Sequence, residues 1–329
     1  MDNITHSLTG ALAAKLVETS KQSAEDQKGT HRVLFWLMVL CANLPDADAL
    51  LNLVGDPFFV INQHRGLTHS LLFAPVLSFF PALLAYRFSS FKNLKALWMT
   101  ALVGVYLHIF FDVVTTFGTQ LFAPLSAERY SLDWMFIIDP IFTGIMALTL
   151  FLVKRASRHR KAFALAGGLF VISYLLLEMV SHQVAYYRLK ETVREQRIAA
   201  QKISALPQPL SIFRWTGLVQ TEEAVLQSFF SLFDTAEKQV FAAFPQARDS
   251  YVDRALQTHE AVWFMRFARH PWIQSIPQAE GHLVEIRDRQ FSSNPELTRA
   301  LGFAERQPPF VLRFQFSSDG ALLSTTFNE

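Results

Sequence analysis

The chain has a single cysteine, and this scarcity removes one means of stabilising a fold. Cys41 lies inside an apolar run, so no intrachain disulfide can form, and one thiol says little about the redox compartment. Charge is also nearly balanced, because the net charge at pH 7 is only +2. That small excess gives no indication of a nucleic-acid partner.

Several familiar sequence signals are missing as well. The N-terminus has no basic segment followed by a long apolar core and a small-residue cleavage site, so we expect no removable signal peptide. Neither a short repeat nor a low-complexity tract is present. A Gly-x-Ser-x-Gly elbow, a phosphate-binding loop and a Cys–His nucleophile arrangement are all absent, so covalent catalysis has no support in the sequence.

What the chain does have is apolar surface, unevenly distributed. Hydrophobic residues make up 51% of the 329 positions, and 31 residues are phenylalanine. The excess is concentrated in the first 181 positions. The sequence therefore predicts a membrane-embedded half followed by a soluble half.

The apolar segments of the first half predict a polytopic transmembrane helical bundle with five or six membrane helices. Three segments have about 19 residues, the length that a spanning helix needs. Others are shorter or contain proline, which neighbouring helices can accommodate. The long segments are Ala96–Val114, Met135–Val153 and Ala162–Val180, and the others are Ile4–Thr19, Val33–Leu44 and Leu71–Tyr86.

Positive charges in the connectors predict the orientation of this bundle. Three connectors together hold eleven Lys and Arg residues, whereas the two between them hold only two. The positive-inside rule places the first set in the cytoplasm, and it places the N-terminus and everything after about residue 182 outside. The first set is 20–32, 86–95 and 154–161; the second is 51–68, with Arg65, and 118–134, with Arg129.

The chain after residue 181 predicts two further parts. Residues 182–204 are highly charged and predict a solvated helix leading away from the bilayer. Residues 205–329 predict a small extracytoplasmic α+β domain. Its expected elements are strands at 211–219, 224–233 and 283–291, a helix at 250–268 and a terminal hairpin at 310–327.

Acidic and imidazole side chains gather at the outer side of the predicted bundle. His31 and His159 fall on the cytoplasmic side and are excluded. We predict that the outer groups converge on bound metal, because charge at membrane depth needs a partner or a function. The candidate ligands are Asp2, His6, Asp46, Asp48, His64, His69, His108 and Asp112.

Two of these pairs carry most of the prediction. His108 and Asp112 are four residues apart within an apolar helix and share a face, although they could instead be a hydrogen-bonded couple between helices. Asp46 and Asp48 follow Pro45, and carboxylates so close repel unless a cation lies between them or one is protonated. The alternative is that Asp46 caps a helix.

The other two pairs are weaker by themselves. His64 and His69 are five residues apart, which suits a loop entering a helix, but they could be interfacial residues, with His69 capping the helix. Asp2 and His6 share a face only if the first helix begins early, and chain ends are often frayed.

Mixed imidazole and carboxylate ligands favour zinc, with manganese or iron as alternatives. The candidates outnumber the ligands of one zinc ion, which indicates two or three metals. Such a cluster activates water near neutral pH and stabilises charge on a phosphoryl or acyl oxygen. Arg65 is then a candidate anion clamp, and Asp46 or Asp48 a candidate general acid or base.

The motifs that carry these residues resemble the YdjM-like family of bacterial membrane-bound metal-dependent hydrolases over about residues 1–150. They are Asp2-Asn-Ile-Thr-His6, Leu44-Pro-Asp-Ala-Asp48, His64-Arg-Gly-Leu-Thr-His-Ser70, His108-Ile-Phe-Phe-Asp112 and Thr115-Thr-Phe-Gly118. The resemblance implies an inner-membrane protein whose metal site is made of these His and Asp residues. More distantly, the pattern is similar to zinc-dependent phospholipase C enzymes, which suggests a phosphoester substrate.

The sequence thus favours a metal-dependent hydrolase at the outer face of the inner membrane, acting on an ester or phosphoester of a lipid or other amphiphile. The alternative is a non-catalytic membrane protein with a structural or transported metal ion. Transport needs polar groups that continue to the cytoplasmic side, and few are there apart from Lys15 and Glu18. A third possibility is that the outer domain is the functional part and the bundle is an anchor.

Overall fold

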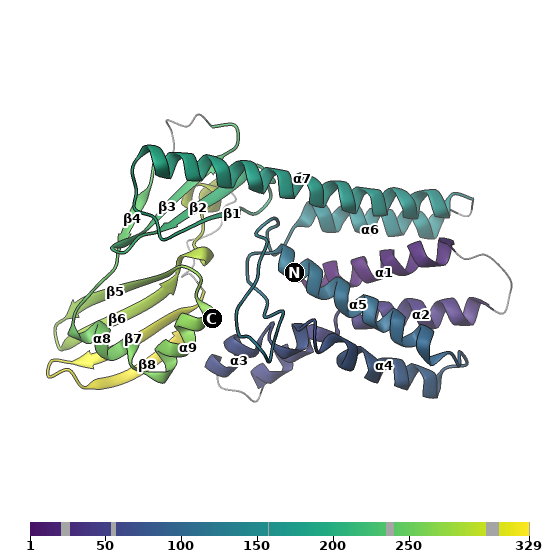
Figure 1. Cartoon of the computed structure of the whole chain (residues 1–329), viewed down its shortest axis with the longest axis horizontal. Coiled ribbons are helices and arrows are strands. Elements are labelled where there is room, and N and C mark those ends of the chain that lie inside the picture. The colour runs from purple at the N-terminus through teal and green to yellow at the C-terminus, as the bar shows by residue number, and fades with distance from the viewer. Residues whose placement is uncertain (21–26, 54–56, 157, 235–239, 301–308, 329) are drawn as a thin grey trace. The chain divides into compact units, whose positions relative to one another are not determined.

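The structure, a computed structural model, describes residues 1–20, 27–53, 57–156, 158–234, 240–300 and 309–328 (Figure 1). It divides into two compact units. The first comprises Met1–Val54 and Gln63–Val180, and the second comprises Gly55–Asn62 and Ser181–Glu329. Residues 55–62 therefore belong to the second unit although segments of the first precede and follow them in the chain.

The first unit is helical, and its breaks fall where the sequence places proline or a capping residue. Pro45 cannot continue an α-helical hydrogen-bond ladder, and the chain changes there to a 3₁₀ helix. Asn93 and Asp139 each accept backbone N–H bonds at the start of a helix. The helices are α1 (Asn3–Ser20), α2 (Gln27–Cys41), η1 (Leu44–Leu53), η2 (Leu67–His69), α4 (Ala74–Phe88), α5 (Leu94–Val114), α6 (Pro140–Arg155) and α7 (Arg160–Glu195).

Among the described residues, two helices are long and apolar enough to cross a membrane, α5 and α7. Two bent pairs raise the number to four if each pair is one broken span. These are Gly29–Cys41 with Leu44–Leu50, bent by 46°, and Ile61–His69 with Ala74–Phe88, bent by 70°. The expected five or six spans are not confirmed. The segment predicted at 135–153 forms α6, a helix of 16 residues that begins only at Pro140.

Helices α1, α2 and α5 pack closely because glycines lie where they meet (Figure 1). A Cβ atom on Gly10 would lie 2.8 Å from the Cβ of Ala42, and one on Gly104 would lie 2.8 Å from the carbonyl oxygen of Met38. Small residues at such crossings allow the backbones to approach, which is a common way of packing membrane helices. Apolar side chains of α2, α4 and α5 fill the core beside these crossings.

The second unit contains two four-stranded antiparallel sheets, ordered β1-β2-β3-β4 and β5-β6-β7-β8. The first sheet packs around the buried Trp215, and the second packs against two short helices, α8 and α9. The strands are β1 (Lys202–Pro207), β2 (Arg214–Gln220), β3 (Ala224–Ser231), β4 (Ala242–Pro245), β5 (Pro271–Gln278), β6 (Gly281–Asp288), β7 (Val311–Ser317) and β8 (Leu322–Asn328). The helices are α3 (Pro57–Gln63), α8 (Ser250–Leu256), α9 (His259–Phe267), η4 (Arg289–Phe291) and α10 (Pro295–Ala300).

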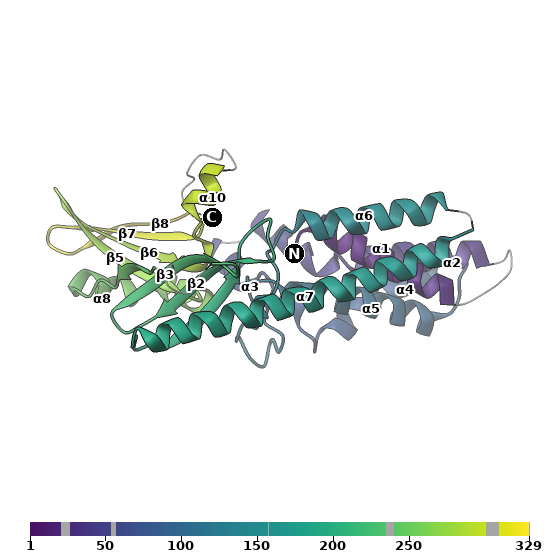
Figure 2. The ribbon, with the colours of Figure 1, turned by 90° about the horizontal axis from the view of Figure 1, so that it is seen from above.

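Most expected elements of this unit are confirmed, with one correction. The strands predicted near 211–219, 224–233 and 283–291 and the terminal hairpin are present as β2, β3, β6 and β7–β8. The helix predicted at 250–268 is two helices, because Thr258 caps α9 through its hydroxyl and interrupts the first helix. The predicted charged helix after residue 182 is continuous with the apolar part of α7, which runs without a break to Glu195 (Figure 2).

Candidate metal centre

Three elements of the first unit bring the candidate ligands together. Asp46 and Asp48 lie on η1, which exists because Pro45 ends the preceding helix. His69 lies on η2, and His108 and Asp112 lie one turn apart on α5. Segments more than 60 residues apart in the chain therefore supply one cluster.

Four side chains form the buried part of the cluster. The Nε2 atom of His69 lies 3.4 Å from Asp46 Oδ1 and 3.2 Å from Asp112 Oδ2. The Nε2 atom of His108 lies 3.4 Å from the same Asp46 oxygen and 3.5 Å from the same Asp112 oxygen. The two Nε2 atoms are 3.0 Å apart. All four groups offer ligand atoms within 4.8 Å of one another.

Hydrogen bonds on the far side of each ring determine which nitrogen faces the centre. His108 Nδ1 lies 2.8 Å from the carbonyl oxygen of Ala42, which can only accept, so Nδ1 carries the proton. His69 Nδ1 lies 3.0 Å from the hydroxyl of Thr68, whose own proton goes to Asp48. Both Nε2 atoms therefore direct their lone pairs toward the same point. In metal sites, a hydrogen bond at the other ring nitrogen orients a histidine ligand in this way.

These distances fit a cation of the size of zinc. Four ligand atoms at about 2.1 Å from a tetrahedral zinc ion lie about 3.4 Å from one another. The five separations between the four groups given above are 3.0–3.5 Å. Two bare ring nitrogens and two carboxylate oxygens repel at such distances unless a cation compensates them. Asp112 Oδ2 is in addition buried without a hydrogen bond, and the Arg65 guanidinium is its ion partner.

A second group shares one ligand with the first. Asp46, Asp48 and His64 offer atoms within 4.8 Å of one another, so Asp46 belongs to both groups. His64 Nδ1 lies 3.0 Å from Asp48 Oδ1. The side chains of His69, His108 and Asp112 have no exposed surface, whereas Asp46 is 11% and His64 29% exposed. The second group is therefore the side of the cluster that solvent reaches.

The turn that carries His64 also supplies a buried cation. Arg65 has a positive φ of 57°, and the guanidinium Nε lies 2.9 Å from Asp112 Oδ2. Its Nη1 donates to the carbonyl oxygen of Asp112 and to the hydroxyl of Thr115. Gly66 is required by this turn, because a Cβ there would lie 2.6 Å from the carbonyl oxygen of Gln63. Arg65 thus holds Asp112 through its Nε and Nη1 atoms.

The two N-terminal candidates lie differently. The ring of His6 stacks on that of His108 at 3.8 Å, and its Nε2 lies 3.2 Å from Asp112 Oδ1, which the Met1 ammonium group also contacts. Asp2 is not brought into either group, because its carboxylate accepts from the backbone and hydroxyl of Thr5 and caps α1. Its spacing to His6 did indicate a helix start, but a capping role satisfies the same pattern.

Arg129 is a residue of the site that the motifs did not indicate. It donates to the carbonyl oxygens of His64 and Gly118, and its guanidinium and that of Arg65 both lie over the ring of Phe117. Burial, and then the charge of Arg65, lowers the pKa of Arg129 to about 10, so it remains charged at neutral pH. The only signal in the sequence was its isolation as a positive charge in the 118–134 connector.

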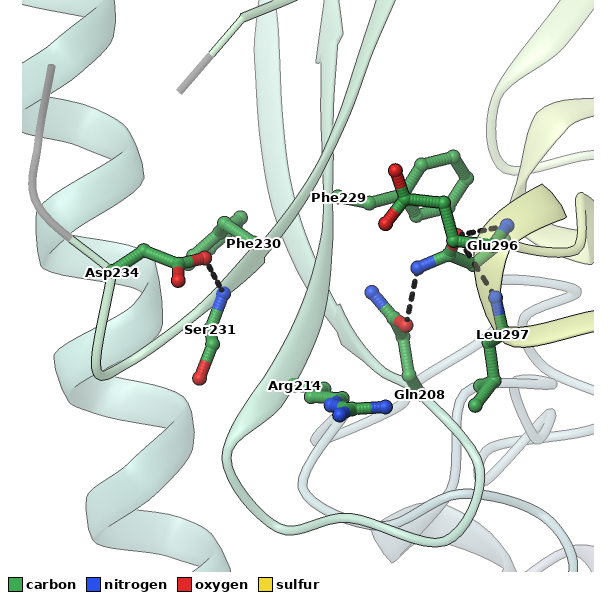
Figure 3. Close-up of a pocket in the computed structure, with 9 residues that line it drawn as sticks. Gln208, Arg214, Phe229, Phe230, Ser231, Asp234, Glu296 and Leu297 are labelled. Atoms are coloured by element: carbon green, nitrogen blue, oxygen red, sulfur yellow. Dashed lines mark hydrogen bonds between the residues drawn. The ribbon is translucent and has the colours of Figure 1, made fainter. Parts of the chain in front are cut away.

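The second unit has a cavity of its own, with a volume of about 360 Å³ (Figure 3). Arg214 and Phe229 line it from the first sheet, and Glu296 lines it from α10. Its buried amide, that of Gln208, accepts from Asn294 and donates to the carbonyl oxygen of Trp215, so both ends are satisfied. Nothing in this lining resembles the ligand set of the first unit.

An apolar helical unit with a buried cluster of imidazoles and carboxylates defines a membrane protein with residues that could hold metal. Sequence comparison gives the family. The profile of the YdjM inner membrane protein family matches residues 1–185, and the chain belongs to that family. The resemblance seen in the motifs is thereby confirmed, and the chain is a protein of the inner membrane.

Two relatives show how far the similarity extends. The chain is 27% identical to the "Uncharacterized protein YfhP" of Bacillus subtilis (strain 168) over 199 residues, which is 60% of this chain and 59% of that protein. It is 35% identical to the "Inner membrane protein YbcI" of Escherichia coli (strain K12) over 108 residues, 32% of this chain and 61% of that protein. Each match thus spans about three fifths of the relative. No solved structure matches the chain.

Proposed function

We propose that the first unit is a metal-dependent hydrolase that cleaves an ester or phosphoester of a lipid or other amphiphile at the outer face of the membrane. One observation carries the proposal. Four ligand atoms of Asp46, His69, His108 and Asp112 converge at distances suited to zinc, and Asp46 also belongs to a second, partly exposed group.

The two residue groups could hold two metal ions, and Asp46 belongs to both groups. Zinc is the preferred ion because imidazole and carboxylate are its usual ligands in water-activating sites, with manganese or iron as alternatives. Metal bound there would supply Lewis acidity, which lowers the pKa of water and stabilises negative charge on a phosphoryl or acyl oxygen.

The chain's own groups have separate tasks in this proposal. Asp46 and Asp48 are the candidates for holding or moving a proton, because they lie at the solvent-accessible side beside His64. Arg65 was predicted as an anion clamp. Its contacts with Asp112 and Thr115, made through Nε and Nη1, support a positioning role.

The substrate class follows from the surroundings of the accessible side. Leu67, Leu71 and Leu72, in and beside the segment that carries His64 and His69, are exposed. Exposed leucines beside an accessible polar cluster suit a substrate with an apolar tail. The distribution of Lys and Arg in the connectors supports an outward-facing site and an extracytoplasmic second unit.

Metal analysis of the purified full-length protein is the first test. Asp46→Ala and His108→Ala should each remove bound metal, whereas His159→Ala, which changes an exposed histidine outside the cluster, should retain it. Full metal retention in both cluster variants would overturn the proposal.

Lipid-class profiling then separates catalysis from a structural or transported metal. The metal-loaded protein should convert one lipid class that the apo protein and Asp46→Ala leave intact. Metal binding without turnover of any ester or phosphoester lipid, together with metal flux into liposomes, would favour transport instead. Activity that survives in residues 205–329 alone would assign the function to the second unit.

A further inference from the structure

Glu178 is an ionisable residue that the metal cluster does not use. It lies in the apolar part of α7, and only 2% of it is exposed. Its Oε2 atom is buried without a hydrogen bond, and among the described residues no Lys, Arg or His forms an ion pair with it. An acid in such a place is a functional candidate, because leaving one of its oxygens buried and without a hydrogen bond is costly.

The titratable groups beside Glu178 are Tyr174, one turn earlier on α7, and Asp139, at the start of α6. Tyr174 donates its hydroxyl to Asp139 Oδ2 at 2.6 Å. Asp139 Oδ1 accepts from the backbone N–H groups of Ile141 and Phe142, both at 2.9 Å. Asp139 therefore accepts three hydrogen bonds and lies at the N-terminal end of α6.

The two neighbouring carboxyl groups therefore differ in their hydrogen bonding and surroundings. Both oxygens of Asp139 accept hydrogen bonds, whereas Glu178 has one buried oxygen without a hydrogen bond, lies in an apolar part of its helix and has the charge of Asp139 nearby. When two acids interact, such a difference of environment assigns the proton to one of them. None of the described hydrogen bonds or ion pairs joins these three residues to the metal cluster.

We propose that Glu178 is a proton-binding site of the membrane unit, separate from the metal cluster, in which the glutamate is a neutral carboxylic acid at neutral pH. Tyr174 and Asp139 complete the site. The phenol bonds to the aspartate, and the aspartate's negative charge favours retention of the proton on Glu178. The ligand of the site is a proton, and its loss would leave two adjacent carboxylates within the bundle.

A hydrophobic carbodiimide tests this directly, because it reacts with protonated carboxyl groups in apolar surroundings. The acid's proton moves to a carbodiimide nitrogen, the carboxylate oxygen bonds to the central carbon, and acyl transfer to nitrogen leaves a stable N-acylurea with no leaving group. The full-length protein in detergent is treated with dicyclohexylcarbodiimide at neutral pH, and peptide masses locate the adduct. We expect it on Glu178, and not on Glu195, which is exposed on the same helix.

Two variants make the result specific. Glu178→Gln should abolish the adduct. Asp139→Asn, which keeps a good helix cap, removes the neighbouring charge, so labelling of Glu178 should disappear at a lower pH than in the parent protein. The proposal fails if Glu178 in the folded protein reacts no more than Glu195 although both react after denaturation. It also fails if the pH dependence is the same in Asp139→Asn.

Discussion

Arg65 illustrates how a single side chain can hold a cluster in shape. Its guanidinium reaches Asp112 Oδ2, the Asp112 carbonyl oxygen and the Thr115 hydroxyl at once, and it is almost completely buried. A lysine ammonium is a point charge on a flexible stem and cannot reproduce this planar set of bonds. The orientation of Asp112 therefore depends on the guanidinium and not only on its charge.

From this we predict that Arg65→Lys weakens metal binding about 10- to 100-fold, the usual cost of losing a partner of a ligand. Competition with a chelator measures the affinity. Arg87→Lys, an exchange of the same kind at an exposed position, is the control and should bind metal normally. Unchanged affinity in Arg65→Lys would contradict the positioning role.

His270 gives the second unit a pH-dependent stability. It is fully buried, its Nε2 contacts Ser204, and burial together with the charges of Lys202 and Arg269 holds the pKa of His270 well below its usual value. The folded state keeps this ring neutral, whereas the unfolded chain protonates it below about pH 6.5. The unfolded state then binds more protons, so stability falls as the pH falls below that value.

The expected loss is at most about 1.4 kcal/mol per pH unit below about pH 6.5, measured as the free energy of unfolding from tryptophan fluorescence. His270→Gln should reduce this slope. His259→Gln, at an exposed histidine, should not change it. Burial raises the pKa of Asp288, but that residue is common to all three proteins, so the difference isolates His270. Equal slopes in the parent and His270→Gln would contradict the assignment.

For individual residues, the sequence predicted which of them belong to the site better than it predicted the role of each. Spacing and membrane depth indicated Asp46, His69 and His108, which the fold does bring together. They could not indicate that Asp2 caps α1, because a cap and a ligand share the same residue type and spacing. Arg129 carries no motif at all, since its role depends on backbone carbonyls that only the folded turn presents.

Among the elements, the crossing of α2 and α5 depends on the absence of a side chain. A Cβ on Gly104 would lie 2.8 Å from the carbonyl oxygen of Met38 and 2.9 Å from the Cβ of Cys41, so a backbone would have to move. Gly144 on α6 offers a matched comparison, because a Cβ there would meet nothing within 4 Å. The two glycines differ in packing while both are helical.

Gly104→Ala should therefore destabilise the protein by about 1–3 kcal/mol through overpacking. Gly144→Ala should be neutral or stabilising by up to about 1 kcal/mol, because alanine is the better helix former. Thermal unfolding in detergent measures both. Equal effects of the two substitutions would show that helix propensity, and not the close crossing, determines the outcome.

The elements themselves were predicted where local chemistry decides them. Pro45 marks a break that the structure contains, and alternation of apolar residues located β6 and the β7–β8 hairpin. The start of α6 at Pro140, inside the segment predicted at 135–153, was missed. The break at Thr258 and the unbroken course of α7 to Glu195 were missed. At Thr258 a hydroxyl cap starts a new helix within a segment whose composition predicted one helix. In α7 the helix continues although its composition changes from apolar to charged.

For the whole molecule, the distribution of Lys and Arg predicts which connectors face outward. In a Cys41→Ala background, Glu128→Cys should react with a membrane-impermeant maleimide in intact cells or spheroplasts. Arg87→Cys should react only after the membrane is opened. Both positions are exposed in the fold, so accessibility and not burial decides the reaction. The opposite pattern would place the second unit in the cytoplasm and overturn an outward-facing site.

The number of spans shows where whole-molecule prediction stops. Hydropathy counts apolar residues in a window, but it does not register that 29–50 and 61–88 are bent pairs or that α6 is short. Those bends depend on prolines and on polar turns whose partners come from other helices. The two bent segments carry Asp46, Asp48, His64 and His69, whereas His108 and Asp112 lie on α5, so the site combines broken segments with one regular span.

Because the chain has a single cysteine and no intrachain disulfide, a metal ion held by Asp46 would also affect the stability of the fold. An ion between η1 and α5 would cross-link positions 46 and 112, closing a large loop in a chain that has no disulfide to do so. Because the ligands meet only in the folded protein, such an ion would bind the native state and not the denatured chain, and this would stabilise the fold by mass action. Removing the ion with a chelator should therefore lower the melting temperature of the helical unit. The ion would link helices that are distant in the sequence, as a disulfide does in other proteins.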